Sequence, residues 1–167
     1  TVTITPTVTY GTVTVDLAAG KVHDYAGNGN ADVTDYNVTY DGVAPGVTIS
    51  AGSGVTDPTN ASPFEEVITF DEEVNNFHLE DILVTNGSAG NFDTSDSTEF
   101  TVDITPTASG LVTIDVLANV AEDNAGTYNT AGQLNITYDS NPPTATYTPA
   151  DGATGVSLNA NLSINFS

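Results

Sequence analysis

Apolar and polar residues alternate along most of this chain with a period of two, which is typical of half-buried β-strands. The alternating residues are mainly Val and Thr, and both favour the pleated surface of a sheet. One short helical turn is predicted at 77–81, a turn at Asn86-Gly87 and a polar stretch at 91–98. The pattern predicts strands at 47–49, 66–70, 100–104, 111–117 and 134–138, an apolar region at 74–84, and earlier strands at 2–4, 13–17 and 33–40.

The chain repeats itself at an interval of about 98 residues. The segment Tyr40-Asp41-Gly42-Val43-Ala44-Pro45 returns as Tyr138-Asp139-Ser140-Asn141-Pro142, and three earlier blocks recur in the same order: 1–7 at 101–107, 11–16 at 110–115, and 24–27 at 123–126. The repeat predicts the C-terminal half of one unit at 1–43, a complete unit at 44–142, and the first strands of a following unit at 143–167. The prolines predict short, stiff joints between them.

The fold class expected from this pattern is all-β. Seven strands in fewer than 100 residues, with turns every 8–12 residues, predict an immunoglobulin-like (Ig-like) β-sandwich for the complete unit. The Cys and Trp that mark antibody domains are absent, because the chain contains neither residue type. We therefore expect tandem Ig-like sandwiches, one complete and two partial, without disulfides.

The charge of the chain is strongly one-sided, with 22 acidic residues against one basic residue and a net charge of −21. A nucleic acid or an anionic membrane surface requires a cationic face, which this composition does not supply. No apolar run approaches the length of a membrane span. Because this much like charge repels itself in a folded state, we expect cations to compensate it, either bound or as a saline medium.

Several acidic motifs resemble those of the bacterial Ig-like repeats of large surface adhesins and biofilm proteins. The motifs are Phe70-Asp71-Glu72-Glu73-Val74-Asn75-Asn76-Phe77, Glu80-Asp81-Ile82-Leu83-Val84-Thr85-Asn86-Gly87 and Asp123-Asn124-Ala125-Gly126, with Tyr-Asp…Pro closing the unit. The segment 148–156 is similar to the opening of Ig-like modules in S-layer-type surface proteins. The resemblance implies a tandem β-sandwich stalk that is often calcium-dependent and is not an enzyme.

The order of strands in an Ig sandwich predicts where the acidic loops meet. The loops after the second and sixth strands emerge at the end where the chain enters, so their carboxylates and the linker should converge there. Such a cluster needs a cation, and Ca²⁺ suits an all-oxygen ligand set better than Mg²⁺, zinc or copper. The alternative is a set of solvated acids on a salt-adapted protein. The predicted ligands are Asp41, Asp71, Glu72, Glu73, Glu122 and Asp123 at this joint, Asp24 and Asn28 facing the preceding unit, and Asp139 at the next joint.

Catalytic constellations are weak in this sequence. His23 and His78 lie far apart with no nucleophile at a recognisable spacing, and the pair Glu65-Glu66 lacks a cleft for glycosidase chemistry. We therefore expect no enzyme. A sugar-binding accessory module would need an aromatic platform, for which Tyr25, Tyr36 and Tyr128 are the candidates in a chain without Trp.

The function expected from these features is a structural segment of a long extracellular adhesin or filament, made rigid by Ca²⁺ between neighbouring repeats. The alternatives are an S-layer or lattice module and a carbohydrate-binding module of a secreted enzyme. Expected partners are neighbouring repeats in the same chain, other copies in a filament or lattice, and a surface glycan or cell-surface target. The chain reads as part of a longer secreted protein, so any secretion signal lies outside it.

Overall fold

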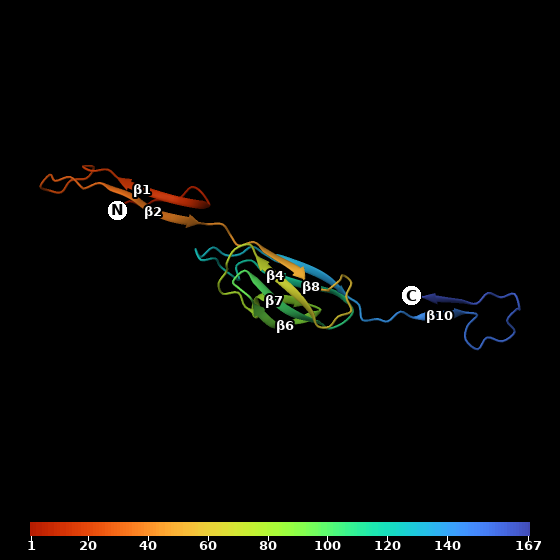
Figure 1. The fold of residues 1–167 in the computed structure, drawn as a ribbon. Coiled ribbons are helices and arrows are strands. Elements are labelled where there is room, and N and C mark those ends of the chain that lie inside the picture. Colours follow the sequence, from red (N-terminus) through yellow and green to blue (C-terminus); the bar gives the residue numbers. More distant parts are fainter.

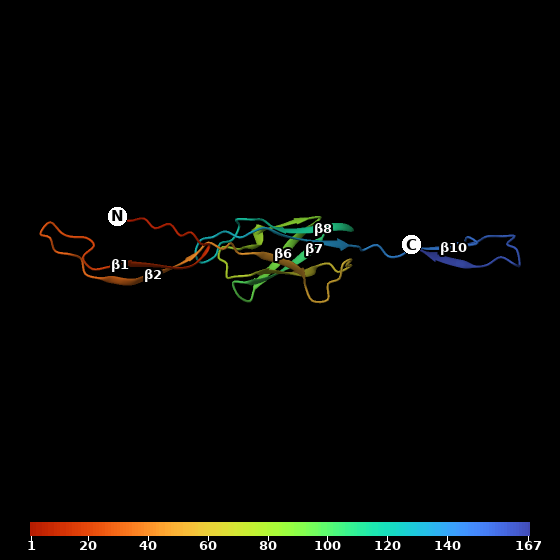
Figure 2. The ribbon, with the colours of Figure 1, turned by 90° about the horizontal axis from the view of Figure 1, so that it is seen from above.

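The computed structural model describes residues 1–167, apart from the side chain at position 35. Three bodies follow one another in a row: an N-terminal hairpin, a central sandwich and a C-terminal hairpin (Figures 1 and 2). The N-terminal hairpin pairs β1 (Tyr10–Leu17) with β2 (Val33–Asp41), and the C-terminal one pairs β10 (Ala145–Thr148) with β11 (Ser163–Phe166). The central unit contains β3 (Val47–Ala51), β4 (Phe64–Phe70), the 3-10 helix η1 (Leu79–Asp81), β5 (Ile82–Thr85), β6 (Gly87–Thr94), β7 (Glu99–Pro106), β8 (Gly110–Val116) and β9 (Gly132–Tyr138).

The central unit is a sandwich of two antiparallel sheets. One sheet has the strand order β3-β4-β7-β6 and the other β5-β8-β9. This is the strand arrangement of a seven-strand Ig-like domain, in which the first, second, fifth and fourth strands face the third, sixth and seventh. The all-β, Ig-like fold predicted from the sequence is therefore confirmed.

Alternating side chains of the two sheets form one apolar core. Ile68 of β4, Val102 and Ile104 of β7, and Val112 and Ile114 of β8 are completely buried. At the end of the unit that faces the N-terminal hairpin, aromatic rings dominate the core and meet edge to face or stacked, with centroids 5.0 to 5.9 Å apart. The rings belong to Phe70, Phe77, Phe92 and Phe100.

Two of the predicted elements differ from the structure. Residues 2–4 form no strand, whereas the equivalent β7 pairs with β4 and β6, and the N-terminal hairpin has no counterpart of either neighbour. The short helical turn predicted at 77–81 is confirmed as η1, and β5 follows it in the predicted apolar region at 74–84. Part of the polar stretch at 91–98 belongs to β6. This strand lies at the edge of its sheet and has no fully buried side chain, so the sequence shows no alternation of apolar and polar residues there. The Asn86-Gly87 turn joins β5 to β6, which lie in different sheets.

The two end hairpins expose the apolar faces that the central unit buries. Val38 of β2 is 47% exposed, while its repeat equivalent Ile136 is 3% exposed. Ile164 of β11 is 55% exposed, while its equivalent Ile68 is 0% exposed. A cavity of ≈ 480 Å³ opens on the C-terminal hairpin beside Tyr147, Leu162 and Ile164. The loop after β10, from Pro149 to Ala153 together with Val156, also lines this cavity.

Candidate metal site at the interdomain joint

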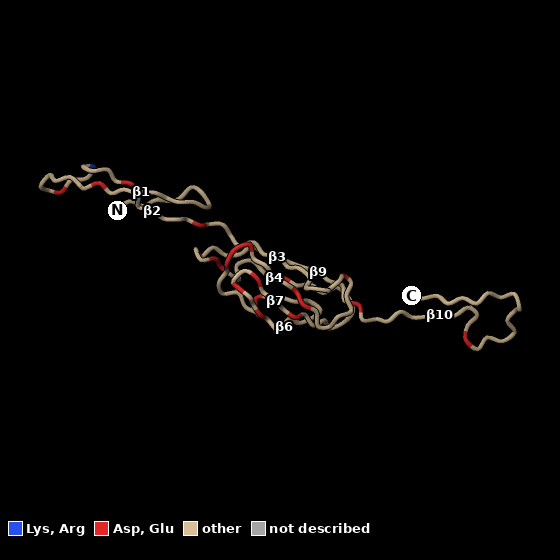
Figure 3. The backbone as a smooth tube through the Cα atoms, in the orientation of Figure 1, with Lys and Arg blue, Asp and Glu red and all other residues tan. Residues whose placement is uncertain are grey.

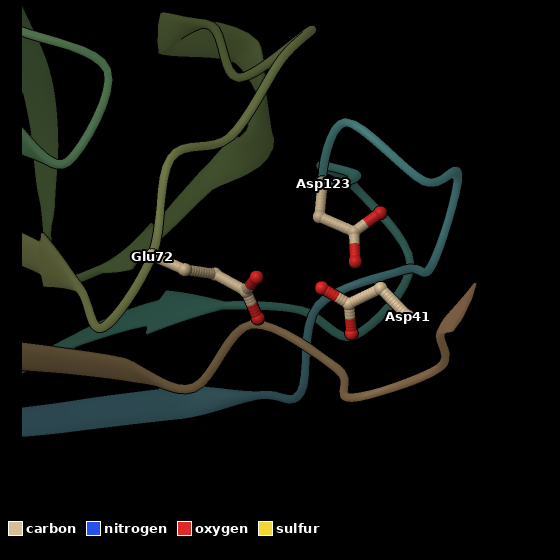
Figure 4. A group of neighbouring side chains, drawn as sticks. All are labelled: Asp41, Glu72 and Asp123. Carbon is tan, nitrogen blue, oxygen red and sulfur yellow. The ribbon is translucent and has the colours of Figure 1, made fainter. Parts of the chain in front are cut away.

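Acidic residues gather where β2 leads into the central unit (Figure 3). Three of them, Asp41, Glu72 and Asp123, each bring one carboxylate oxygen within 4.8 Å of the other two. Figure 4 shows the three side chains reaching toward one another from separate segments of the chain. Among the described residues this is the one group of three or more potential metal-ligating side chains at such distances. Asp41 ends a strand of the N-terminal hairpin, so the group spans two units.

Glu72 is positioned by a short loop that the core holds at both ends. The loop leaves β4 after Phe70 and returns to the core at Phe77, and the two rings lie 5.1 Å apart. Val74 is also buried, and its N–H donates to the carbonyl of Ser97. The loop is therefore fixed to the sandwich by apolar contacts, and the half-buried Glu72 lies on its side toward the joint.

Asp123 lies in the loop after β8 and organises that loop itself. Its Oδ1 accepts hydrogen bonds from the N–H groups of Ala125 and Thr127 at 2.7 and 2.8 Å. The side chain is only 5% exposed, and the second oxygen, Oδ2, is buried without a hydrogen-bond partner among the described atoms. Burial raises the pKa of Asp123, but the N–H donors of Thr127 and Ala125 outweigh it and leave the pKa lowered. Asp123 is thus a charged carboxylate with one unused, buried oxygen.

Asp41 is fixed from the N-terminal side of the joint. It pairs with Tyr10 in the β1–β2 ladder, and the next residue, Gly42, donates its N–H to the carbonyl of Thr9 at 2.6 Å. The Asp41 Oδ1 accepts the N–H of Val43 at 3.1 Å. Asp41 therefore moves with the hairpin rather than with the central unit.

The linker that follows Asp41 is anchored to the central unit within a few residues. Pro45 is fully buried, and its carbonyl accepts the N–H of Thr130 at 2.9 Å. Gly46 donates its N–H to Asp71 Oδ1 at 2.7 Å. A Cβ at position 46 would lie 2.7 Å from Asp71 Oδ2, so glycine permits this close approach. The joint is short and held on both sides.

The two loops of the central unit are tied to each other beside the acidic group. Asn75 and Glu122 exchange two backbone hydrogen bonds of 2.7 and 3.2 Å. Asn76 Nδ2 donates to Glu122 Oε1 at 3.1 Å, and Asn124 Nδ2 donates to Glu73 Oε2 at 3.3 Å. These bonds fix the distance between the segments that carry Glu72 and Asp123.

The three carboxylates are close enough to oppose their joint ionisation. The pKa of Glu72 is raised, first by burial and then by the charges of Asp123, Asp41 and Asp71. At these separations the repulsion is on the order of a few tenths of a kcal/mol per pair after solvent screening. A divalent cation would convert this repulsion into attraction. An open depression of ≈ 390 Å³ is lined by the three carboxylates together with Glu73 and Asn124.

The other ligands predicted for this joint lie nearby but have different partners. Asp71 accepts the Gly46 N–H and contributes to the repulsion felt by Glu72. Glu73 lines the depression and accepts a hydrogen bond from Asn124. The Glu122 carboxylate is engaged with Asn76. The structure therefore brings three of the six predicted residues into one group and places the other three around it.

The ligands predicted for the neighbouring joints lie apart from any such group. Asp24 accepts hydrogen bonds from the Asn28 N–H and side-chain amide at 2.8 and 2.9 Å, and these bonds lower its pKa. Asp139 accepts the N–H of Asn141 at 2.9 Å, as Asp41 does from Val43. Neither Asp24 nor Asp139 belongs to a group of three acids among the described residues.

Sequence reasoning missed the asparagine that holds the Asp123 loop together. Asn129 is 2% exposed and forms four hydrogen bonds with the backbone of its own loop. Its Oδ1 accepts the N–H groups of Val120 and Ala121, and its Nδ2 donates to the carbonyls of Leu117 and Thr130. The signal was present in the repeat, because Asn30 stands at the equivalent position.

The sequence profile of the bacterial Ig-like domain matches residues 41–140, which cover more than half of the chain and begin at Asp41. The chain belongs to the bacterial Ig-like domain family. A comparison with curated proteins and one with solved structures each gave no match. The matched range covers the central unit and its linker, so the acidic joint lies at the edge of the bacterial Ig-like domain.

The bacterial Ig-like domain is typically a non-catalytic fold, and the other candidate residues are dispersed. His78 lies 3.8 Å from Asp81, and His23 lies in a loop of the N-terminal hairpin. Tyr25 and Tyr36 belong to the N-terminal hairpin, whereas Tyr128 belongs to the central unit. The described chain contains no helix with the length and apolar character needed to cross a bilayer.

Proposed function

We propose that this chain is a structural, non-catalytic segment of a long extracellular bacterial adhesin or filament, and that Ca²⁺ at the joint fixes the angle between neighbouring units. The observation that carries the proposal is the composition of the acidic group. Asp41 belongs to the hairpin before the joint, and Glu72 and Asp123 belong to the domain after it. An ion held by all three would join the two units directly.

Calcium fits the chemistry of the group better than other common metals. The ligand atoms are carboxylate oxygens, and Ca²⁺ accepts six to eight oxygens at about 2.3–2.6 Å with tolerant geometry. Glu73, loop carbonyls and water are available to complete the shell around the depression. Zinc and copper prefer nitrogen or sulfur ligands, and the group contains neither. The unused Oδ2 of Asp123 gains a partner when an ion is present.

A bridging ion would have a mechanical effect. Units that meet over a small area move relative to each other by default. Three ligands from both sides of a short linker restrict that motion, and the same arrangement in successive repeats makes a stiff rod. Such a rod suits a surface stalk in calcium-containing surroundings, and the strongly acidic composition accords with a cation-rich medium.

The test compares two linker aspartates that form the same local hydrogen bond. Asp41→Asn and Asp139→Asn both keep an oxygen that can accept the N–H two residues later, but only Asp41 has acidic companions. Thermal unfolding of the full chain is followed with calcium, with magnesium and with chelator. In wild type we expect calcium to stabilise the central unit by about 2–3 kcal/mol at a hundredfold excess over the dissociation constant. Asp139→Asn should keep this effect and Asp41→Asn should lose most of it.

Small-angle scattering supplies the mechanical readout for the same proteins. Calcium should lengthen the largest dimension of wild type and of Asp139→Asn, and leave Asp41→Asn unchanged. Identical unfolding curves of wild type with calcium and with chelator would refute the calcium joint. Stabilisation without any change in scattering would refute the stiffening alone.

A further inference from the structure

The central sandwich buries one carboxyl group that has no structural partner. Glu66 of β4 is 0% exposed, and neither of its side-chain oxygens has a hydrogen-bond partner among the described atoms. It occupies an inward position between Phe64 and Ile68, which are themselves buried. Across the sheet it pairs with Val102 of β7 on one side and Ala51 of β3 on the other. An ionised carboxylate in such a position loses its hydration without compensation.

The strands around Glu66 carry no cation that could neutralise it. The chain has a single Lys and no Arg, and that Lys lies in the N-terminal hairpin. The other acidic residues of the core strands alternate with buried residues and therefore point outward. Tyr138 packs against the core but makes no hydrogen bond to Glu66. The titratable groups on β4, β6, β7, β8 and β9 besides Glu66 are Glu65, Asp93, Glu99, Asp103, Asp115 and Tyr138, and β3 and β5 contribute none.

The C-terminal hairpin carries an apolar residue at the position equivalent to Glu66. The registers of β3–β4 and β10–β11 align Phe70 with Phe166 and Ile68 with Ile164. The same alignment places Leu162 at the position of Glu66. Leu162 is 87% exposed in the hairpin, so the comparison concerns the residue type and not its packing. The C-terminal hairpin therefore does not share the carboxyl group that the central unit carries at this position.

We propose that Glu66 is a proton-controlled switch of the central unit, which is firmly folded while the Glu66 carboxyl is protonated and loosens when this group ionises. Burial raises the pKa of Glu66 from 4.5 to about 7. Because the folded-state pKa lies above the unfolded-state value, the folded state holds the proton more tightly. The contribution of Glu66 to stability is therefore greatest below about pH 4.5, falls as the pH rises through the folded-state pKa near 7, and is lost above it.

The size of the effect follows from the two pKa values. A difference of this magnitude changes the folding equilibrium constant on the order of 100-fold between mildly acidic and mildly alkaline solution. The switch acts inside the sandwich and is independent of the calcium joint, because Glu66 lies in the core and the joint lies beyond Phe70. The two proposals can consequently fail separately.

The experiment measures the denaturant midpoint of the full chain from pH 5 to about 8.5, with chelator present throughout so that calcium makes no contribution. Wild type should lose stability over this range. In Glu66→Leu, the part of this loss that corresponds to about a 100-fold change in the folding equilibrium constant should be absent. The variant should therefore be more stable than wild type at alkaline pH. Glu65→Gln is the matched control, because it removes an exposed carboxylate from the neighbouring position of the same strand. It should retain the wild-type slope.

Equal slopes in wild type and Glu66→Leu would overturn the proposal. If the leucine variant fails to fold, the carboxyl carbon of Glu66 in wild type is titrated by NMR. A midpoint near 7 supports the switch, and a midpoint near the ordinary value of 4.5 overturns it.

Discussion

The same loop occurs twice in this molecule, once after β1 in the N-terminal hairpin and once after β8 in the central domain. In both copies an Asp accepts the N–H groups two and four residues later: Asp24 from Ala26 and Asn28, and Asp123 from Ala125 and Thr127. The glycine three residues after the aspartate has φ of 87° in one copy and 86° in the other, a conformation that glycine adopts without strain. The loop is therefore encoded locally, since it forms without the rest of a sandwich.

The two copies differ in what surrounds the aspartate. Asp24 is exposed, and its second oxygen accepts the Asn28 side chain. Asp123 is buried, its second oxygen is unpartnered, and its carboxylate belongs to a group with Asp41 and Glu72. The loop supplies one well-placed carboxylate, and only the preceding linker and the loop after β4 turn it into a site. The predictions below test this division between local loop and assembled site.

The largest expected effect concerns the asparagine that closes each loop. Asn129→Ala removes the partners of four backbone groups, two of them the N–H groups of Val120 and Ala121, and should destabilise the central domain by roughly 2–4 kcal/mol. Asn30→Ala removes the same four bonds from the N-terminal copy and should leave the central domain unchanged. Denaturation followed by the Ile114 methyl resonance measures this. Equal effects of the two variants would show that the loops are not independent units.

The next effect concerns calcium. Asp123→Asn keeps the oxygen that accepts the Ala125 and Thr127 N–H groups but removes the charge, so the variant should fold and lose most of the calcium-induced stabilisation. Asp24→Asn, its repeat equivalent, should keep all of it. Thermal unfolding with calcium and with chelator distinguishes the two. If both variants respond to calcium as wild type does, Asp123 is not a ligand.

The smallest expected effect is that of Glu72→Gln, which should stabilise the chain in chelator and destabilise it in calcium. Glu72 carries a raised pKa, caused by burial and by the neighbouring acids Asp123, Asp41 and Asp71. Glu72→Gln should therefore stabilise the chain in chelator by about 0.5–1 kcal/mol, because it relieves repulsion. In calcium it should be destabilising, because a ligand is lost. Destabilisation in both conditions would mean that Glu72 acts through packing rather than charge.

Protonation of Glu72 should have the same stabilising effect in chelator as the Glu72→Gln substitution. A raised pKa means that protonation of Glu72 favours the folded state, so the wild-type penalty from this group should shrink as the pH falls through its folded-state value. Glu72→Gln should lack that part of the pH response. Parallel pH profiles of wild type and Glu72→Gln would contradict it.

Much of the fold could be predicted from the sequence because alternation and the repeat are local signals. Strands such as β4 and β8 bury every second residue, and that period is visible directly. The β6 edge strand was missed because its residues, Gly and Asn among them, bury little and gain their order from pairing with β7. Residues 2–4 alternate as a strand does, but they have no neighbouring strands to pair with. Alternation alone therefore predicted a strand that does not form.

The candidate site, like the fold, could be predicted from the sequence only in part. The topology of an Ig sandwich predicts that the loops after β4 and β8 meet at the linker, and it selects the acidic segments. It does not predict which carboxylates converge, because that depends on hydrogen bonds such as those of Asp71 with Gly46 and of Glu122 with Asn76. In the sequence, Glu66 stands out only as one member of the pair Glu65-Glu66. Its burial became apparent only when the register placed it opposite Val102.

The central claim is that one Ca²⁺ is shared between the N-terminal hairpin and the bacterial Ig-like domain. A crystal structure of the full chain grown with calcium, with anomalous data to identify the ion, tests it most directly. We expect a peak at the joint with oxygens of Asp41, Glu72 and Asp123 at about 2.3–2.6 Å. A joint with no ion at saturating calcium, or an ion bound without Asp41, would contradict the account.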